Sequence, residues 1–461
     1  MPRRRNRKPP ATPVVAAIES LAHDGRGIAR VDGKTTFVDN ALPGETVRFR
    51  YSNQRSKFDE GCAVEILEAA PERVQPPCAH HLICGGCSLQ HLDSGEQIRR
   101  KQLVLQEQLA HFGQLQPETW LEPLTGPVTG YRGKARLGVK FVEARGHTLV
   151  GFREKRNRFL ADIEQCEVLI PEVGHRLTAL RELIDGLASK RRIPQIEVAR
   201  GDDDIALVFR HLDPLPAEDQ QRLVAFCREQ GWQLYLQPGN ESTVHRLWPA
   251  LEQSEQRLYY RHEGRHAGEP DSVLAFHPTD FTQVNAEINR RMVPLALNLL
   301  DIEPQHQVLD LFCGLGNFTI PAARRAARVV GVEGSAAMVE RGYENARRNG
   351  LENLEFYAWD LSRPPEGQPW AQRQYPRVLL DPPRSGALEM VRMMPHFNVD
   401  RLVYVSCNPA TLARDAGELT ALGYRLEAAG VMDMFPHTAH VESIAVFDRR
   451  AAGASGKTAR S

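Results

Sequence analysis

The stretch from Ala275 to Asp448 alternates strand patterns with helix patterns, and this order constrains the fold more than any other feature of the chain. Such alternation is typical of α/β proteins with a doubly wound parallel sheet. Ligands and chemistry in open sheets of this kind gather at the carboxyl ends of the strands. We therefore expect functional side chains directly after the strands in this part of the chain.

The first of these strands leads into a glycine turn that suits a nucleoside ligand. The apolar run that contains Asp310 is followed by Gly314 and Gly316, which let the backbone approach a ligand closely. The third glycine of a dinucleotide fingerprint is absent, because Thr319 stands at that position. The next strand ends in Glu333, and a carboxylate there accepts hydrogen bonds from ribose hydroxyls.

The acidic strand ends, together with this turn, resemble the S-adenosylmethionine site of class I methyltransferases. Asp360 follows the third strand pattern and Asp381 follows the fourth, which strengthens the resemblance beyond a lone glycine motif. A Rossmann-like domain that binds NAD is the alternative, and Gln283 taken alone fits a plain helix start. The resemblance implies these cofactor-binding residues: Gln283, Phe312, Asn317, Glu333, Asp360 and Asp381.

Cys407 lies where the apolar run Arg401–Ser406 gives way to a helix. Backbone N–H groups at a helix start create an environment that favours the thiolate. A cysteine after an apolar strand is also a common inert core residue. The residues that accompany Cys407 decide between these interpretations.

A thiol and a carboxylate beside a methyl donor favour methylation of carbon 5 of uracil. Carbon 5 becomes nucleophilic once a thiolate adds to carbon 6, and a base must then remove the carbon 5 proton so that elimination restores the ring. We assign the first role to Cys407 and the second to Glu442, with His437 and His440 as rival bases. Asp381 either hydrogen-bonds the base edge or the adduct, or serves mainly the cofactor. Arg384 stands where amino-methyltransferases have a stacking aromatic residue, which argues against N-methylation of adenine.

Residues 13–70 form a second kind of pattern, with short alternating strands between Gly and Asp turns. About five such strands in this length indicate a small barrel. The stretch resembles the TRAM domain, an OB-like RNA-binding barrel. Farther along, Tyr131–Arg158 contains nine Lys or Arg, two Glu and interleaved aromatic residues. That composition suits a surface that neutralises phosphates and stacks bases, with a solvated strand face as the alternative.

Four cysteines form a candidate metal site, because Cys78, Cys84 and Cys87 are closely spaced and Cys166 follows later. Four thiolates hold either a zinc ion or an iron–sulfur cluster, and nearby histidines keep zinc open. The absence of a signal peptide and of any apolar run of membrane-spanning length favours a cytoplasmic protein that does not span a membrane. In that compartment disulfides are disfavoured. The net charge is zero, so global charge indicates no partner.

Three motifs closely resemble those of the RNA uracil-C5 methyltransferases: Asp381–Arg384, Val405–Asp415 and Met434–Glu442. The likeness extends from the barrel to Phe447. It implies S-adenosylmethionine as methyl donor and a [4Fe–4S] cluster on the four cysteines. The combination of barrel and cluster implies the branch that methylates 23S ribosomal RNA. Another ribosomal or transfer-RNA uridine, and a catalytically silent RNA-binding or assembly protein, are the alternatives.

The predicted protein is thus an α/β enzyme: a class I, Rossmann-like methyltransferase domain with a TRAM barrel and a mixed α+β central domain that carries the four-cysteine cluster. We expect a monomer. The expected order of segments is a basic arm at 1–12, the barrel at 13–70, the central domain at 71–270, the methyltransferase domain at 271–450 and a tail at 451–461.

Overall fold

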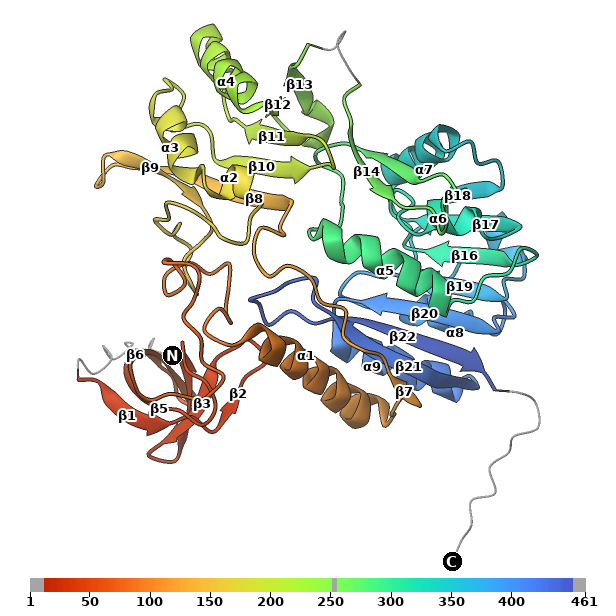
Figure 1. Cartoon of the computed structure of the whole chain (residues 1–461), viewed down its shortest axis with the longest axis horizontal. Coiled ribbons are helices and arrows are strands. Elements are labelled where there is room, and N and C mark those ends of the chain that lie inside the picture. The colour runs from red at the N-terminus through yellow and green to blue at the C-terminus, as the bar shows by residue number, and fades with distance from the viewer. Residues whose placement is uncertain (1–11, 251–254, 451–461) are drawn as a thin grey trace, which may run out of the picture.

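A computed structural model describes residues 12–250 and 255–450 (Figure 1). The expected tail at 451–461 and all but the last residue of the expected arm at 1–12 lie outside these residues. Within the described chain, no helix combines the length and the apolar character needed to cross a bilayer. Three sheets of six, six and eight strands organise the molecule, together with a two-stranded sheet.

The N-terminal sheet confirms the expected small barrel. Short segments with alternating burial pair in the order β1-β5-β6-β4-β3-β2. Val38, Val47 and Phe49 are fully buried inside it, because every second side chain of these strands faces the interior. The strands are β1 (Val14–Ala17), β2 (Ser20–Leu21), β3 (Gly27–Val31), β4 (Lys34–Asp39), β5 (Thr46–Gln54) and β6 (Phe58–Glu68).

The central sheet has helices α3 (Leu177–Asp185) and α4 (Ala217–Gln230) packed against it. Its strand order is β13-β12-β11-β10-β8-β9, so β9 forms one edge. Apolar side chains such as Leu137 on a strand and Leu180 on a helix share one buried cluster. The strands are β8 (Lys134–Val142), β9 (His147–Gly151), β10 (Gln195–Arg200), β11 (Ile205–Arg210), β12 (Gln233–Gln237) and β13 (His245–Trp248).

The eight-stranded sheet confirms the doubly wound α/β prediction. Its order is β18-β17-β16-β19-β20-β22-β21-β7, and the strands from β18 to β20 run parallel. β22 runs antiparallel between β20 and β21. The strands are β7 (Thr119–Trp120), β16 (Gln307–Leu311), β17 (Arg328–Glu333), β18 (Leu354–Ala358), β19 (Arg377–Leu380), β20 (Arg401–Ser406), β21 (Tyr424–Met432) and β22 (Glu442–Arg449).

Separate apolar clusters cover the two faces of this sheet. The first is built with α5 (Ala286–Leu299), α6 (Thr319–Ala323) and the two-stranded sheet of β14 (Leu258–His262) and β15 (Ser272–Phe276). The helix α7 (Ala336–Arg348) packs beside them. The second cluster is built with α1 (Ser94–Gln108), α8 (Leu388–Arg392) and α9 (Pro409–Ala421).

The packing of α1 and β7 departs from the expected segment boundaries. Both lie within 71–270, which the sequence assigns to the central domain. In the structure α1 packs on β21 and α9, and β7 extends the eight-stranded sheet through parallel pairing with β21. Local periodicity gives the apolar face of a helix but not its partner, which here is more than 300 residues away along the chain.

Candidate active site

The polar side chains predicted to form a site lie along one edge of the eight-stranded sheet. Because β16 to β20 are parallel, their carboxyl ends meet at this edge, and antiparallel β22 begins there. The residues after or at these ends are Phe312, Glu333, Asp360, Asp381, Cys407 and Glu442. The register of the sheet therefore brings together side chains from six separate segments.

Cys407 lies opposite Glu442 across two neighbouring strands. Ser406 pairs with Ser443 in the antiparallel β20–β22 ladder, so one further step in the same register places Cys407 against Glu442. Glu442 is 4 % exposed. Burial, and then the Asp381 carboxylate, raise the pKa of Glu442 well above its ordinary value, while Arg384 opposes the shift.

The surroundings of Cys407 oppose the thiolate that the helix start was expected to favour. Burial raises the pKa of the Cys407 thiol, and the Glu442 carboxylate raises it further, against a smaller lowering by Arg384. The first N–H groups of α9 do not reverse this balance, since Asn408 accepts a hydrogen bond from the main chain of Ala410 at 3.2 Å. The effect of desolvation on the pKa of Cys407 is therefore larger than the effect of the N–H groups at the start of α9.

The glycine turn after β16 forms a cradle of left-handed backbone. Gly314 and Gly316 have φ values of 55° and 100°, and Phe312 has φ 65°. The Glu333 carboxylate accepts hydrogen bonds from the N–H of Gly314 at 3.1 Å and of Ser335 at 3.0 Å. The Glu333 carboxylate therefore fastens the end of β17 to the turn.

Asp310 supplies a buried acceptor beside this turn. Its Oδ2 accepts a hydrogen bond from Thr319 Oγ1 at 2.6 Å, while its Oδ1 is buried without a partner among the described residues. Burial raises the pKa of Asp310 to about 7 and, separately, that of Asp381 to about 7. An orphaned acceptor next to a positive-φ turn fits a ligand that donates hydrogen bonds at this edge.

The side chain of Asn317 is held by several protein groups. Its Oδ1 lies within 3.1 Å of Tyr260 Oη, His262 Nε2 and Asn289 Nδ2. Its Nδ2 donates to Asn289 Oδ1 at 2.9 Å. Asn317 therefore ties the glycine turn to β14 and α5, and the sequence had no local feature that indicated this network.

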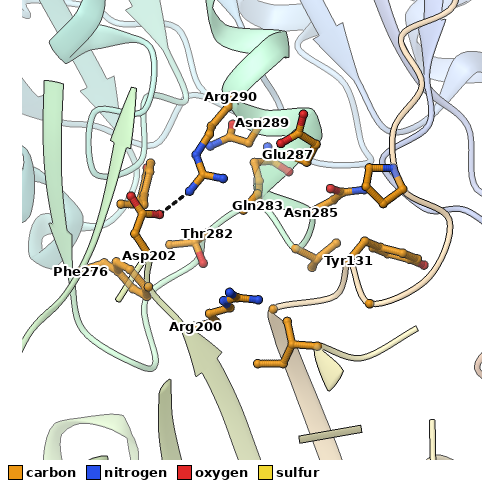
Figure 2. A pocket seen from close by; sticks show the side chains of 18 residues that line it. Tyr131, Arg200, Asp202, Phe276, Thr282, Gln283, Asn285, Glu287, Asn289 and Arg290 are labelled. Carbon is orange, nitrogen blue, oxygen red and sulfur yellow. Dashed lines mark hydrogen bonds and ion pairs between the residues drawn. The ribbon is translucent and has the colours of Figure 1, made fainter. Parts of the chain in front are cut away.

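Gln283 lines a cavity of about 190 Å³ between β10 of the central sheet and the elements β14, β15 and α5. Figure 2 shows this cavity, with Arg290 paired to Asp202 at 2.6 Å. Tyr260 and Asn289, both partners of Asn317, line the same cavity. Gln283 therefore shares a cavity with two residues that contact Asn317, and its role toward a cofactor stays a prediction.

Asp360 is exposed at the outer end of the sheet. Its Oδ1 accepts a hydrogen bond from the hydroxyl of Ser362 at 2.6 Å, and its carboxylate pairs with Arg363 at 3.1 Å. Hydrogen bonding from Ser362 lowers the pKa of Asp360. Its carboxylate is therefore ionised and available as an acceptor.

The segment before Glu442 is held by α1, which the sequence did not reveal. Gln97 Oε1 accepts a hydrogen bond from the N–H of His437 at 2.8 Å, and Gln97 Nε2 lies 3.2 Å from His437 Nδ1. Lys101 forms a buried ion pair with Asp433 at 2.7 Å. These partners are 340 and 332 residues apart along the chain, so no local pattern links them.

The cysteine-rich loop, which connects β6 to α1, also contacts the segment before Glu442. The N–H groups of Ser88 and Leu89 both donate to the carbonyl of His437 at 2.9 Å. Burial lowers the pKa of His437 and of His440, and His440 Nδ1 lies 3.4 Å from an Arg384 nitrogen. The lowered pKa values favour the neutral form of both rival bases. Structural contacts hold the main chain and Nδ1 of His437, while its Nε2 is buried without a partner among the described residues.

The four predicted cluster cysteines line one cavity of about 190 Å³, which joins the loop of residues 78–87 to Cys166. Burial raises the pKa of Cys87 to about 12 and that of Cys166 to about 11, and the neighbouring thiolates add to both shifts. Across the described ranges, no group of three or more His, Cys, Asp and Glu is arranged to hold a metal ion. The four thiols therefore line one cavity but are not arranged as the ligands of a metal ion.

Known proteins match the chain in sequence and in fold. The model of the tRNA (Uracil-5-)-methyltransferase family matches residues 266–362 and 367–450, and that of the TRAM domain matches residues 14–50. A 23S rRNA (uracil(1939)-C(5))-methyltransferase RlmD from Alcanivorax borkumensis is 70 % identical over 97 % of this chain and 99 % of its own. The protein of the same name from Alkalilimnicola ehrlichii is 56 % identical, again over 97 % and 99 %.

A solved structure shares the whole architecture. The tRNA (uracil-54, C5)-methyltransferase of Pyrococcus abyssi, in complex with S-adenosyl-L-homocysteine, superposes with a TM-score of 0.69. It is 23 % identical in sequence and covers 94 % of this chain and 100 % of its own. At this identity the similarity shows the fold.

Proposed function

This chain is an enzyme of the RNA uracil-C5 methyltransferase family, and on that premise we propose that it transfers a methyl group from S-adenosylmethionine to carbon 5 of a uridine in 23S ribosomal RNA. The names of the relatives specify uracil 1939, and we propose the same nucleotide. The observation that carries the proposal is the placement of Cys407 against Glu442 at the strand edge beside the glycine turn.

In this mechanism Cys407 is the nucleophile. Its thiolate adds to carbon 6 of the flipped-out uracil and makes carbon 5 electron-rich. Because burial raises the pKa of the thiol, its proton must be lost as the base enters the site. Arg384, which lowers the pKa of Cys407, is placed to favour the anion.

Glu442 is the proposed general base. A carboxylate whose pKa is raised is a stronger base once ionised, so the burial of Glu442 suits removal of the carbon 5 proton. Gln97 and the cysteine-rich loop hold the main chain of His437, and we assign this residue a positioning role. Elimination then breaks the carbon 6–sulfur bond, returns Cys407 as the thiolate with the proton on Glu442, and releases the methylated base.

Some of the predicted cofactor residues are proposed to contact the cofactor directly, whereas Asn317 contacts other protein groups. S-adenosylmethionine, when bound, supplies an electrophilic methyl group. The Glu333 and Asp360 carboxylates supply acceptors for its polar ends, beside the glycine turn whose Gly314 N–H already donates to Glu333. Phe312, Gln283 and Asp381 complete the proposed set, and the orphaned Oδ1 of Asp310 adds an acceptor. Asn317 supports the turn through its protein contacts.

The test is transfer of label from S-adenosyl-[methyl-³H]methionine to 23S RNA from a strain without this modification. We expect 5-methyluridine at the proposed nucleotide, mapped by nuclease digestion and mass spectrometry. Label at another uridine of ribosomal or transfer RNA would correct the substrate. An absence of label, with RNA binding intact, would favour a catalytically silent binding protein.

For the cysteine cavity we propose a [4Fe–4S] cluster with a structural role. The support is the convergence of four cysteines on one cavity, two of them buried and two partly buried, whose thiolates repel one another and which a cationic group would stabilise. Anaerobically purified protein should contain iron and acid-labile sulfide, and Cys87→Ser should lose both. Zinc without sulfide would correct the assignment. Full folding and full methylation by chelated apo-protein would remove the structural role.

We further propose that the enzyme is a cytoplasmic monomer. Its substrate is made in that compartment, and its thiols suit reducing conditions. Sedimentation equilibrium of the purified protein tests the oligomeric state, with the mass of one chain, 51.8 kDa, as the expected result.

A further inference from the structure

β8 and β9 lie at the edge of the central sheet (Figure 1). Residues of both strands line a groove. Its volume is about 910 Å³. The buried residues of β8 and β9 pack with α3 in one apolar cluster, while Arg136, Gly138 and Lys140 alternate on the other face of β8. The groove is therefore a feature of the sheet surface that the helices leave open.

Two glycines make the floor of the groove low and apolar. Gly138 pairs with Gly151 across β8 and β9. A Cβ on Gly138 would meet Leu160 at 2.6 Å, and a Cβ on Gly151 would meet Ile163 at 2.6 Å. Because these Cβ atoms are absent, Leu160 packs directly on the sheet and lines the groove together with Leu149.

The rim of the groove carries positive charge without matching carboxylates. Lys140, Arg153 and Arg158 line it and form no ion pair within residues 12–250 and 255–450. Two other lining arginines are already paired with acidic residues outside the rim. Glu154 is the acidic residue among the lining side chains, and it accepts a hydrogen bond from Asn157 at 2.8 Å.

An exposed aromatic side chain stands at the same rim. Phe159 is 59 % exposed, and the guanidinium of Arg158 lies 5.6 Å from the centre of its ring. An aromatic face beside unpaired cations is the combination that binds single-stranded nucleic acid, because bases stack while phosphates meet the cations. A double helix would hide its base faces, and an acidic protein would leave the apolar floor and the ring without a use.

We propose that this groove binds a single-stranded segment of the substrate RNA that lies outside the target nucleotide. The inference rests on the proposed function and adds a second contact region to it. Lys134 at the start of β8, two residues before the groove residue Arg136, donates to the carbonyl of Pro278 in the segment before α5. The strand that carries the groove therefore starts beside the methyltransferase domain. An RNA strand that leaves the active site can therefore continue along β8.

The test compares charge and stacking variants with matched controls by equilibrium binding to an rRNA fragment that contains the target and its flanking strands. Lys140→Ala/Arg153→Ala should lower the slope of log affinity against log salt by about 1.4, the value for two contacts on a single strand. Phe159→Ala should weaken binding about tenfold with no change in slope. The controls are Arg222→Ala/Arg228→Ala on α4, and Phe112→Ala, because Phe112 is 60 % exposed away from the groove.

The rate of methylation at saturating RNA should stay within about twofold of the parent in every variant. The binding of the variants therefore tests the groove, whereas the methylation rate of the parent enzyme tests the proposed function, which fails only if the parent does not methylate. Ultraviolet crosslinking should join the peptide that contains Phe159 to a flanking single-stranded nucleotide. Salt slopes equal to the parent in Lys140→Ala/Arg153→Ala, or crosslinks confined to the target nucleotide, would overturn the proposal, and preferred binding of an acidic protein would replace it.

Discussion

Gln97 of α1 holds His437 at two points, through its main-chain N–H at 2.8 Å and near its ring Nδ1 at 3.2 Å. His437 has φ 64°, so the backbone turns sharply here, five residues before Glu442. Gln97 also donates to the carbonyls of Leu89 and Leu92. One buried amide therefore joins the cysteine-rich loop to the turn that precedes the proposed base.

Gln97→Ala should reduce the methylation rate more than the affinity for RNA. The change leaves the buried N–H of His437 without an acceptor, which costs about 1–3 kcal/mol and releases the turn. Single-turnover rates and RNA dissociation constants measure the two effects. Gln106→Ala, on the same helix and partly exposed, is the control and should match the parent. An equal loss in both quantities would indicate a general folding defect.

Lys101→Met should destabilise the protein strongly, because it leaves Asp433 buried without its partner. Both side chains are 3 % exposed, and removal of one member of such a pair costs about 3–5 kcal/mol. The double variant Lys101→Met/Asp433→Leu should recover most of the loss in thermal midpoint. If the single and double variants melt together, the pair contributes no coupling.

Glu442→Gln should trap a covalent complex between the protein and its RNA. Addition of Cys407 and methyl transfer do not need the carboxylate, whereas elimination does. A denaturing gel should show the shifted band with Glu442→Gln and no band with Cys407→Ala/Glu442→Gln. Ready turnover by Glu442→Gln would indicate that His437 or His440 is the general base.

Asp381→Asn should become increasingly stabilising relative to the parent as pH rises from about 5 to about 8. Burial raises the pKa of Asp381 from its ordinary value near 4 to about 7 in the folded state. The folded parent therefore holds a proton that the unfolded chain releases, so parent stability falls with rising pH until the folded pKa is passed. The change is at most about tenfold in the unfolding equilibrium per pH unit. Thermal midpoints of both proteins at the two ends of this pH range measure it, and a constant difference would contradict the raised pKa.

Much of the fold and several site positions could be predicted from local sequence. The strand that ends before Cys407, the glycine turn after Leu311 and the carboxylate at Glu333 all follow from short-range patterns. Strand periodicity and the need for positive φ at a turn are properties of a few consecutive residues. These features placed the predicted residues at strand ends, where parallel strands make a common edge.

The pairings and the electrostatics came from contacts between distant segments. The register that sets Cys407 against Glu442, and the hold of Gln97 on His437, depend on how the sheets and α1 assemble. The direction of the Cys407 pKa depends on burial and on two carboxylates brought from other strands, which outweigh the helix start beside it. The local sequence determines which chemical groups lie at the end of each strand. The charge state and the partner of each group arise only when long-range packing removes water and brings other charges near.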